Sequence, residues 1–347
     1  PEPREVCIEL ASLLLQIKQP ANARAVLNTV LQQGSGSPQL HFLVGCTWQL
    51  EGEPRKAAEQ YKLALQLEPN HVASLINLAN IDHASGDYSQ AVRNYSAAIV
   101  LAPDLAEAHF NLAGSLLKLG QYDKARAANA EALSLRPKYI QAWQRQGDIQ
   151  FAIGDYSSAA ASYRECIKLA PQNADALHAL GLSLKNLGHN HQSVEVLKQA
   201  LAMQPENAQV LSSLGNSLSA CGQFGEAVQH FEAAYERERS DSRILGSLIH
   251  HKRRCCDWSD IERLEHELLH RLESSCSGIN PFDVLSIETT PQQQKAVAKE
   301  KSRQAIRSAT RSSLVATAPS SANGPLRVGF LSADFRRHPV AYVILPL

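Results

Sequence analysis

A histidine directly before a proline is the residue best placed for acid–base chemistry in this chain. Residues 326–332, Leu-Arg-Val-Gly-Phe-Leu-Ser, are a short apolar run that predicts a buried parallel strand. Pro339 suits the first position of a helix over 340–347, so His338 stands at the N-terminus of that helix. The positive end of the helix dipole favours a neutral imidazole, which can accept a proton from a hydroxyl group. The free amides of the same turn favour phosphate. The alternative is that His338 only caps the helix.

Two asparagines, Asn77 and Asn111, stand 34 residues apart in the similar contexts Ile-Asn-Leu-Ala and Phe-Asn-Leu-Ala. An asparagine amide offers a donor and an acceptor at once, which matches a peptide group without demanding a particular side chain. Ordinary polarity on a helix surface is the alternative. The equivalent residues of other copies break the series; they are Leu43, Arg145, Ala179 and Ser213.

A third candidate is the segment from His250 to Trp258, which contains two histidines, two cysteines and an aspartate. Adjacent cysteines strain shared metal coordination, and no second Cys-x-x-Cys or His-x-x-x-His follows at a useful spacing. The basic residues of this segment instead favour the C-terminal end of a helix, with Trp258 anchoring the next one. We therefore expect no metal.

The elements that carry most of these residues repeat with a fixed period. A proline and a glycine each return every 34 residues, at Pro69, Pro103, Pro137, Pro171 and Pro205 and at Gly52, Gly86, Gly120, Gly154, Gly188 and Gly222. This period is the length of one helix–turn–helix unit of the tetratricopeptide type. In the copy 140–173, Gly154 ends the first helix, and Pro171 stops the second. Ala159 lets the two helices approach closely, and Tyr163 fills the space beside it.

The sequence therefore predicts an all-α, right-handed superhelix followed by the first βα unit of an α/β, Rossmann-like domain. The six copies are 38–71, 72–105, 106–139, 140–173, 174–207 and 208–241. Residues 1–37 are predicted as degenerate repeat-like helices, with Lys18 where glycine is expected. Residues 242–311 are a helical transition region, 312–325 a linker rich in Ser, Ala and Pro, and 326–347 the start of the α/β domain. We expect the chain to be a fragment, because both of its ends fall in mid-pattern.

Composition restricts the function classes. The 347 residues carry a formal net charge of +0, so nucleic acid and anionic membranes are poor partners. No apolar stretch is long enough to span a membrane, and residues 1–9 are no signal peptide. Seven scattered cysteines favour a reducing compartment, so we expect a cytoplasmic protein. Neither G-x-G-x-x-G nor a P-loop motif is present.

The order of the motifs resembles a known family. The repeats are followed by Cys-Asp-Trp at 256–258, Asn-Pro-Phe at 280–282 and Gly-Pro-Leu-Arg-Val-Gly-Phe-Leu-Ser-Ala-Asp-Phe-x-x-His-Pro at 324–339. Over its whole length the chain resembles the O-linked N-acetylglucosamine transferases, including their SPINDLY-type members. The segment 324–339 is the specific part of the resemblance, because repeats alone occur in many scaffolds.

This resemblance implies a repeat superhelix coupled to two Rossmann-like lobes of the GT-B type. It implies transfer of a sugar, typically from UDP-GlcNAc, to Ser or Thr hydroxyls of proteins, with no cofactor or required metal. His338 aligns with a histidine of the family's active site, as a base or as a binding group. Asn77 and Asn111 match asparagines that line the inner face of the repeats and hold the peptide backbone. The family's nucleotide-binding residues lie mainly in the second lobe and are not carried over.

We therefore predict a protein O-glycosyltransferase whose repeat arm selects protein or peptide substrates, with a nucleotide sugar as donor. Self-association through the repeats stays open. The chain on its own is expected to be inactive, because it holds only the first strand and turn of the catalytic domain. The alternatives are a non-catalytic repeat scaffold and a transferase of the same fold that uses fucose or glucose. The residues Arg336 and Arg337 differ from the small residues of some family members, which leaves the sugar and the acceptor open.

Overall fold

A computed structural model describes residues 3–32, 36–285 and 287–309 of the chain. The chain divides into two units, Pro1–Ser313 and Leu314–Leu347, and all of the described residues belong to the first unit. Every regular element in these ranges is an α-helix. The helices are α1 (Pro3–Gln16), α2 (Pro20–Gln32), α3 (Pro38–Leu50), α4 (Pro54–Leu67), α5 (Val72–Ser85), α6 (Tyr88–Leu101), α7 (Ala106–Lys118), α8 (Tyr122–Leu135), α9 (Ile140–Ile153), α10 (Tyr156–Leu169), α11 (Ala174–Asn186), α12 (Asn190–Met203), α13 (Ala208–Ala220), α14 (Phe224–Arg237), α15 (Ser242–Arg254), α16 (Ile261–Ser274), α17 (Pro281–Leu285) and α18 (Pro291–Ala309).

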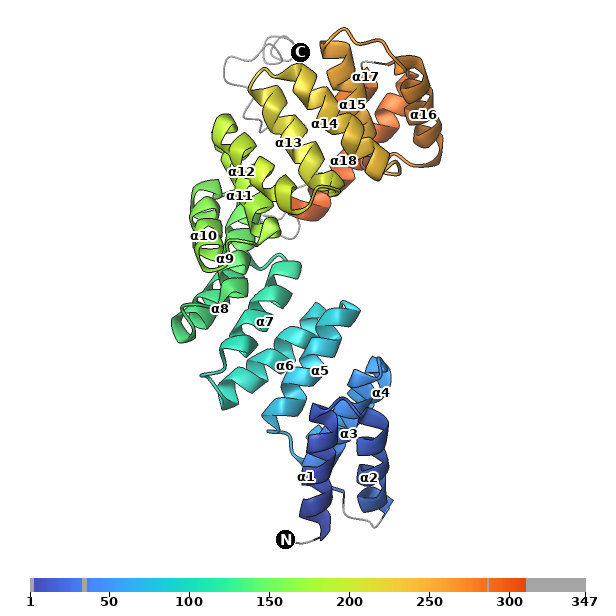
Figure 1. Ribbon diagram of the computed structural model, residues 1–347. Coiled ribbons are helices and arrows are strands. Elements are labelled where there is room, and N and C mark those ends of the chain that lie inside the picture. Colours follow the sequence, from blue (N-terminus) through green and yellow to red (C-terminus); the bar gives the residue numbers. More distant parts are fainter. Residues whose placement is uncertain (1–2, 33–35, 286, 310–347) are drawn as a thin grey trace, which may run out of the picture. The chain divides into compact units, whose positions relative to one another are not determined.

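The helices form pairs that follow one another in chain order (Figure 1). The first helices of the six regular pairs begin at the residues where the predicted copies begin, from Pro38 in α3 to Ala208 in α13. In the six regular pairs, each second helix packs on its partner and on the first helix of the next pair. Each first helix from α5 to α11 also contacts the next first helix along the chain, up to α13. The first helices therefore form one continuous face, which we call the first-helix face.

The recurring glycine is required by the backbone conformation at the end of each first helix. Gly154 has φ +91°, and a Cβ atom placed on it would meet no atom within 4 Å. Glycine is therefore favoured here because the backbone is left-handed, and not because a side chain would be crowded. Two other residues adopt the same conformation one period before and one period after the glycine series, Lys18 with φ 57° and Cys256 with φ 54°.

In five of the six regular pairs the core is built around one large side chain of the second helix, whereas α8 carries the buried Asn129 at the same position. Tyr163 is 2% exposed and lies beside the fully buried Ala159, as predicted from the sequence. Large buried side chains stand at the same register in four other pairs: Tyr61, Tyr95, Leu197 and Phe231. Burial of an aromatic side chain of this size removes about 150–250 Å² from water, so the four aromatic residues of this set contribute strongly to the stability of their pairs.

The transition region starts as a seventh pair and then departs from the period. α15 packs on α14 as a first helix would, but α16 begins at Ile261, three residues later than the 34-residue spacing from α14 requires. Thr290 caps α18, with Pro291 at its first position, and the Oγ1 atom of Thr290 accepts a hydrogen bond from the backbone N–H of Gln293 at 3.3 Å. Trp258 is 63% exposed, so the prediction that it anchors the next helix is wrong. The predicted linker and βα unit lie outside the described residues.

Within the described ranges, no helix has the length and apolar character needed to cross a membrane.

Candidate peptide-binding face

Two rows of side chains run along the first-helix face. They occupy the sixth and ninth positions of successive first helices, which lie on the same side of a helix because they are three residues apart. The sixth positions are Leu43, Asn77, Asn111, Arg145, Ala179, Ser213 and Ser247. The ninth positions are Cys46, Asn80, Gly114, Asp148, Leu182, Asn216 and His250.

Asn77, on α5, is held from behind by a tyrosine of the preceding pair. Its Nδ2 atom donates a hydrogen bond to the hydroxyl oxygen of Tyr61 at 3.2 Å. That hydroxyl group in turn donates to Oε1 of Gln49 at 2.7 Å. The Oδ1 atom of Asn77 accepts no hydrogen bond from the part of the chain that the structure describes. The fold therefore fixes the amide through its donor side and leaves its acceptor side unused.

Asn111, on α7, is held in a similar way through a residue that the sequence analysis missed. Its Nδ2 atom donates to Oδ1 of Asn80 at 3.2 Å, and the same oxygen accepts the hydroxyl hydrogen bond of Tyr95 at 2.5 Å. Here too, no donor among the described residues reaches Oδ1 of the asparagine. The two predicted asparagines thus share an arrangement, but no hydrogen bond brings them together.

The next position along the row is an arginine. Arg145, on α9, lies with its guanidinium carbon 4.2 Å from the ring centroid of Phe110. Burial lowers the pKa of Arg145, and burial also raises the pKa of Asp148, against a hydrogen bond from the Tyr163 hydroxyl at 2.9 Å. A hollow of about 90 Å³ opens beside this group and is lined by Asn80, His83, Tyr95, Asn111 and Arg145.

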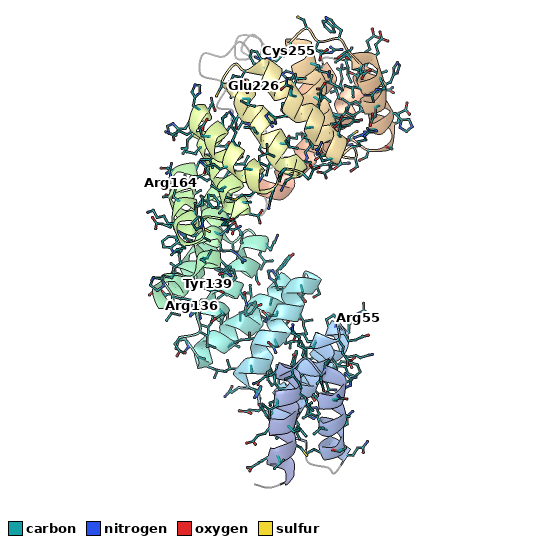
Figure 2. The ribbon with its side chains drawn as sticks, in the orientation of Figure 1. Arg55, Arg136, Tyr139, Arg164, Glu226 and Cys255 are labelled. Carbon is teal, nitrogen blue, oxygen red and sulfur yellow. The ribbon has the colours of Figure 1, made fainter. Side chains whose placement is uncertain are left out.

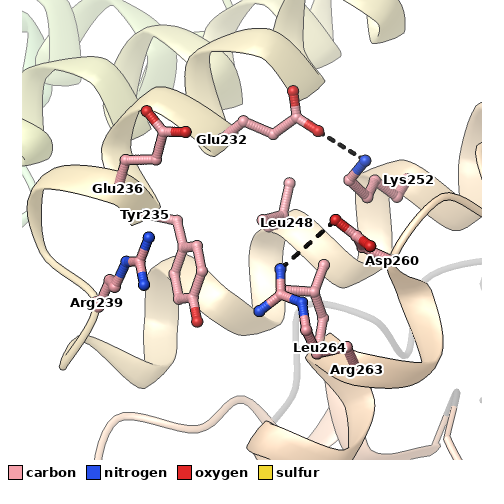
Figure 3. Close-up of a pocket in the computed structure, with 9 residues that line it drawn as sticks. All are labelled: Glu232, Tyr235, Glu236, Arg239, Leu248, Lys252, Asp260, Arg263 and Leu264. Carbon is pink, nitrogen blue, oxygen red and sulfur yellow. Dashed lines mark ion pairs between the residues drawn. The ribbon is translucent and has the colours of Figure 1, made fainter.

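A larger cavity, of about 280 Å³, lies among α14, α15 and α16 (Figure 3). Its lining carries balanced charge. Glu232 pairs with Lys252 at 2.6 Å, and Asp260 pairs with Arg263 at 3.7 Å. Because its charged groups largely satisfy one another, this cavity offers less to a ligand than the hollow beside Arg145 does.

The segment from His250 to Trp258 is organised as the end of a helix. The imidazole Nε2 of His251 lies 2.8 Å from Oγ of Ser219, and its ring stacks on Phe231. The ammonium group of Lys252 contacts Asp257 at 2.7 Å, which lowers the pKa of that carboxyl group to about 2. No group of three or more His, Cys, Asp and Glu residues that could hold a metal ion occurs in ranges 3–32, 36–285 and 287–309.

A further hollow, of about 220 Å³, lies near α13, α15 and α17. It is lined by Asn216, Ser247, His250, His251, Asn280 and Asp283. Burial raises the pKa of Asp283 to about 6. His338, the predicted catalytic residue, lies outside the described residues, so its role stays a prediction.

The paired helices, the left-handed glycines and the side chains that repeat at one register define a tetratricopeptide-repeat protein. Residues 5–244 match the family described as the C-terminal domain of cilia and flagella-associated protein 70, and the chain belongs to this family. The match ends before the segment 324–339 on which the resemblance to the glycosyltransferases rests. No curated protein matches the chain.

Solved structures share the fold at low sequence identity. The Cut9 and Hcn1 hetero-tetramer of the APC/C contains a chain that is 16% identical, with a TM-score of 0.56, covering 72% of this chain and 49% of that one. A tetratricopeptide repeat protein from Parabacteroides merdae is 17% identical, with a TM-score of 0.53 and coverage of 71% and 98%. PilF from Pseudomonas aeruginosa is 20% identical, with a TM-score of 0.53 and coverage of 60% and 94%.

Proposed function

We propose that the first-helix face binds extended segments of partner proteins, so that the described part of the chain acts as a protein-interaction scaffold. The observation that carries this proposal is the state of Asn77 and Asn111. Each amide is fixed through its NH2 group, and each Oδ1 atom is left to accept a hydrogen bond. An extended peptide carries main-chain N–H groups that can fill this role whatever its side chains are.

Two physical points support the proposal. Helix pairs stacked in sequence present a surface much longer than any single pocket, which suits an extended ligand. The side chains that hold Asn77 and Asn111 are already ordered by bonds within the fold, so less conformational entropy is lost when a peptide binds. Membership of a tetratricopeptide family is consistent with this function.

The test is peptide binding by a variant in which both asparagines are changed. Binders would be selected from a random 12-residue peptide library displayed on phage, synthesised with a fluorescent label and measured by anisotropy. Replacing Asn77 and Asn111 by alanine should lower the affinity for the selected peptides about ten- to thirty-fold, because two hydrogen bonds worth about 1 kcal/mol each are lost. The matched control replaces the exposed Asn70 and Asn186 by alanine and should bind as the unchanged chain does. Unchanged affinity in the Asn77 and Asn111 variant would show that another surface binds the peptide.

The second candidate function is protein O-glycosylation, in which the same face selects the substrates of a transferase. It is favoured by the sequence 324–339, and it assigns His338 to the active site. The most fitting donor is UDP-GlcNAc, with fucose or glucose donors as alternatives. In this function the asparagine pair contributes more to long protein substrates than to short peptides, because only a long substrate reaches from the active site to the repeats.

Sugar transfer to a protein acceptor tests this candidate, using the protein as its gene encodes it. The donors are UDP-GlcNAc, UDP-glucose and GDP-fucose in separate reactions. His338→Ala should lower turnover about 100-fold or more if the imidazole transfers a proton, while circular dichroism of the repeat helices stays unchanged. Near-normal turnover in a well-folded variant would show that His338 only caps the helix. A lack of transfer from all three donors would leave the scaffold function alone.

A further inference from the structure

The hollow near α13, α15 and α17 lies at the end of the two rows that follow the first-helix face. Ser247 occupies a sixth position, and Asn216 and His250 occupy ninth positions. Asp283 lines the hollow from α17, which is not part of any regular pair and lies beside α15 (Figure 1). The volume of about 220 Å³ equals the space of roughly seven liquid water molecules, which is enough for an alkylammonium group.

A glycine of α15 makes room for the carboxyl group of Asp283. Gly246 occupies the fifth position of α15, where the six regular first helices carry side chains: Phe42, Ile76, Phe110, Gln144, His178 and Ser212. A Cβ atom on Gly246 would lie 2.3 Å from Oδ2 of Asp283. The carboxyl group therefore packs against bare backbone, and Asp283 is 8% exposed. This glycine allows α17 to bring a carboxylate to the first-helix face.

Other polar groups of the lining can also accept hydrogen bonds. The Nδ2 atom of Asn216 donates to the carbonyl oxygen of Ser212 at 2.9 Å, and its Oδ1 atom faces no donor among the residues that the structure describes. In the same part of the chain, no hydrogen bond reaches Oγ of Ser247 or the ring nitrogens of His250. These atoms are therefore available to a ligand that donates hydrogen bonds.

The lining carries a negative charge at neutral pH. Its titratable groups are His250, His251 and Asp283. Burial lowers the pKa of both histidines, and the ring of His251 lies 2.7 Å from the carbonyl oxygen of Ser247 and 2.8 Å from Oγ of Ser219, which suits a neutral imidazole. Burial raises the pKa of Asp283 to about 6, so its carboxyl group is mainly ionised at pH 7.5.

A positively charged group with several N–H donors fits this lining. An ammonium group carries three N–H donors, and Asn216, Ser247 and Asp283 supply acceptor oxygens from α13, α15 and α17. Hydrogen bonds between ionised groups are about twice as strong as those between neutral groups. Lys185 and Arg254, which after burial also lower the pKa of His251, lie outside the lining.

We propose that this hollow binds a primary ammonium group, supplied by a lysine side chain of the bound segment. The inference rests on the proposed peptide-binding function and adds a specificity to it: the partner carries a lysine at one position. A buried carboxylate is costly to a fold, and binding sites keep such groups where a ligand needs them. Free polyamines carry the same ammonium group, so the test separates the two sources.

The first test compares the peptides that three forms of the chain select from the random 12-residue library. The unchanged chain should enrich peptides that share a lysine at one fixed position. Asp283→Asn removes the charge, keeps the shape of the side chain and should lose this preference. Glu226→Gln removes an exposed carboxylate near the start of α14 and is the matched control, which should keep the preference (Figure 2).

Synthetic peptides then identify the group that is bound. Acetylating the selected lysine should lower the affinity for the unchanged chain ten-fold or more, and should change the affinity for Asp283→Asn by less than about two-fold. Asn216→Ala should lower the affinity for the lysine peptide about three- to ten-fold, because one hydrogen bond is lost. Tighter binding of the matched arginine peptide would overturn the ammonium assignment in favour of a guanidinium group.

Spermidine tests the source of the ammonium group, with binding measured by isothermal titration calorimetry. It should compete with the lysine peptide and bind the unchanged chain at least about ten-fold more weakly than that peptide does. Spermidine that binds more tightly than the peptide, and only when Asp283 is present, would overturn the lysine assignment in favour of a free polyamine. Selected peptides without a lysine preference would overturn the inference and leave peptide binding intact. A library without any enriched peptide would overturn the proposed function and the inference together.

Discussion

The ring of Tyr163 lies against the backbone of Gly147 so closely that no side chain fits at residue 147. A Cβ atom there would come within 2.5 Å of Cε1 of the ring. The same contact recurs between Gly45 and Tyr61, again at 2.5 Å. The tyrosine ring is fully enclosed, so it has no free space into which it could move. These glycines therefore set the distance between the two helices of a pair.

We expect Gly147→Ala to lower the free energy of unfolding by about 1–3 kcal/mol, because overpacking outweighs the higher helix propensity of alanine. Urea unfolding followed by circular dichroism measures the change. Gly225→Ala is the matched control, since a Cβ atom there meets nothing within 4 Å and the residue lies inside α14. Because residue 225 is the second residue of α14, where glycine costs less than in a helix interior, this change should leave the stability unchanged or raise it by less than about 1 kcal/mol. A stabilising effect of Gly147→Ala would show that the two helices of the pair can move apart without cost.

A second prediction follows from the backbone conformation of Cys256. This residue has φ 54°, one period after Gly222, and a non-glycine residue in this conformation costs about 1–2 kcal/mol. Cys256→Gly should therefore raise the free energy of unfolding by about 0.5–1 kcal/mol, allowing for the greater freedom of glycine in the unfolded chain. The neighbouring Cys255 has φ −89°, so Cys255→Gly should be destabilising in the same urea assay. If both variants changed the free energy of unfolding in the same direction, the left-handed backbone of Cys256 would not be the cause.

Lys252 links three elements of the transition region. Its ammonium group lies 2.6 Å from Glu232 and 2.7 Å from Asp257, and its side chain is 5% exposed. Lys252→Met would leave both carboxylates without this partner, and we expect a loss of about 1–3 kcal/mol, moderated because the carboxylates are partly exposed. The exposed Lys138 provides the control, since Lys138→Met should change stability by less than about 0.5 kcal/mol.

The same contact predicts a pH dependence. The pKa of Asp257 is lowered to about 2, chiefly by its hydrogen bond from Lys252. A lowered pKa means that the folded state binds fewer protons, so this stabilisation is complete above about pH 4 and is lost between about pH 4 and pH 2. The difference in thermal stability between the unchanged chain and Lys252→Met should therefore shrink over this range. A difference that stays constant down to pH 2 would show that Lys252 acts through packing alone.

The sequence predicted the repeat because its signals are local. One backbone conformation requires a glycine such as Gly154, and one close helix contact requires a small residue such as Ala159. Each requirement therefore fixes the residue type at one position of the repeat. Lys18 and Cys256 carry the same conformation without the glycine, because an exposed turn tolerates the strain. The period alone therefore underestimates how far the regular backbone extends.

The candidate site was less accessible from the sequence. Asn77 and Asn111 stood out because they repeat in the same context, whereas Arg145 looked like a break in their series. Its significance depends on Gly114, one copy earlier, and on His83, two copies earlier. The contact between a sixth position and the ninth position of the preceding copy recurs 31 residues apart, in Asn77 with Cys46 and in Asn111 with Asn80, but different residue types occupy it in each copy. Comparing each sixth position with the ninth position of the preceding copy would have revealed the pairing of Arg145 with Gly114.

The last prediction concerns Asp283, whose pKa is raised to about 6 by burial, against a lowering effect of the backbone N–H of Asn280. Its carboxyl group also packs tightly on α15, where a Cβ atom on Gly246 would meet Oδ2 at 2.3 Å. A raised pKa means that the folded state binds more protons than the unfolded state, so stability from this group is present below about pH 4 and is lost as the pH rises to about 6.

Asp283→Asn removes the buried charge and keeps the shape of the side chain. The variant should match the unchanged chain at pH 4 and exceed its free energy of unfolding at pH 7.5 by on the order of 2–3 kcal/mol, since one pKa unit corresponds to about 1.4 kcal/mol. Thermal unfolding at half-unit steps of pH measures the difference. Asp104→Asn, at an exposed position, is the control and should show no such trend. If the advantage of Asp283→Asn instead grew on acidification, the carboxylate would be stabilising as an ion, and its contact with α15 would have to be electrostatically favourable.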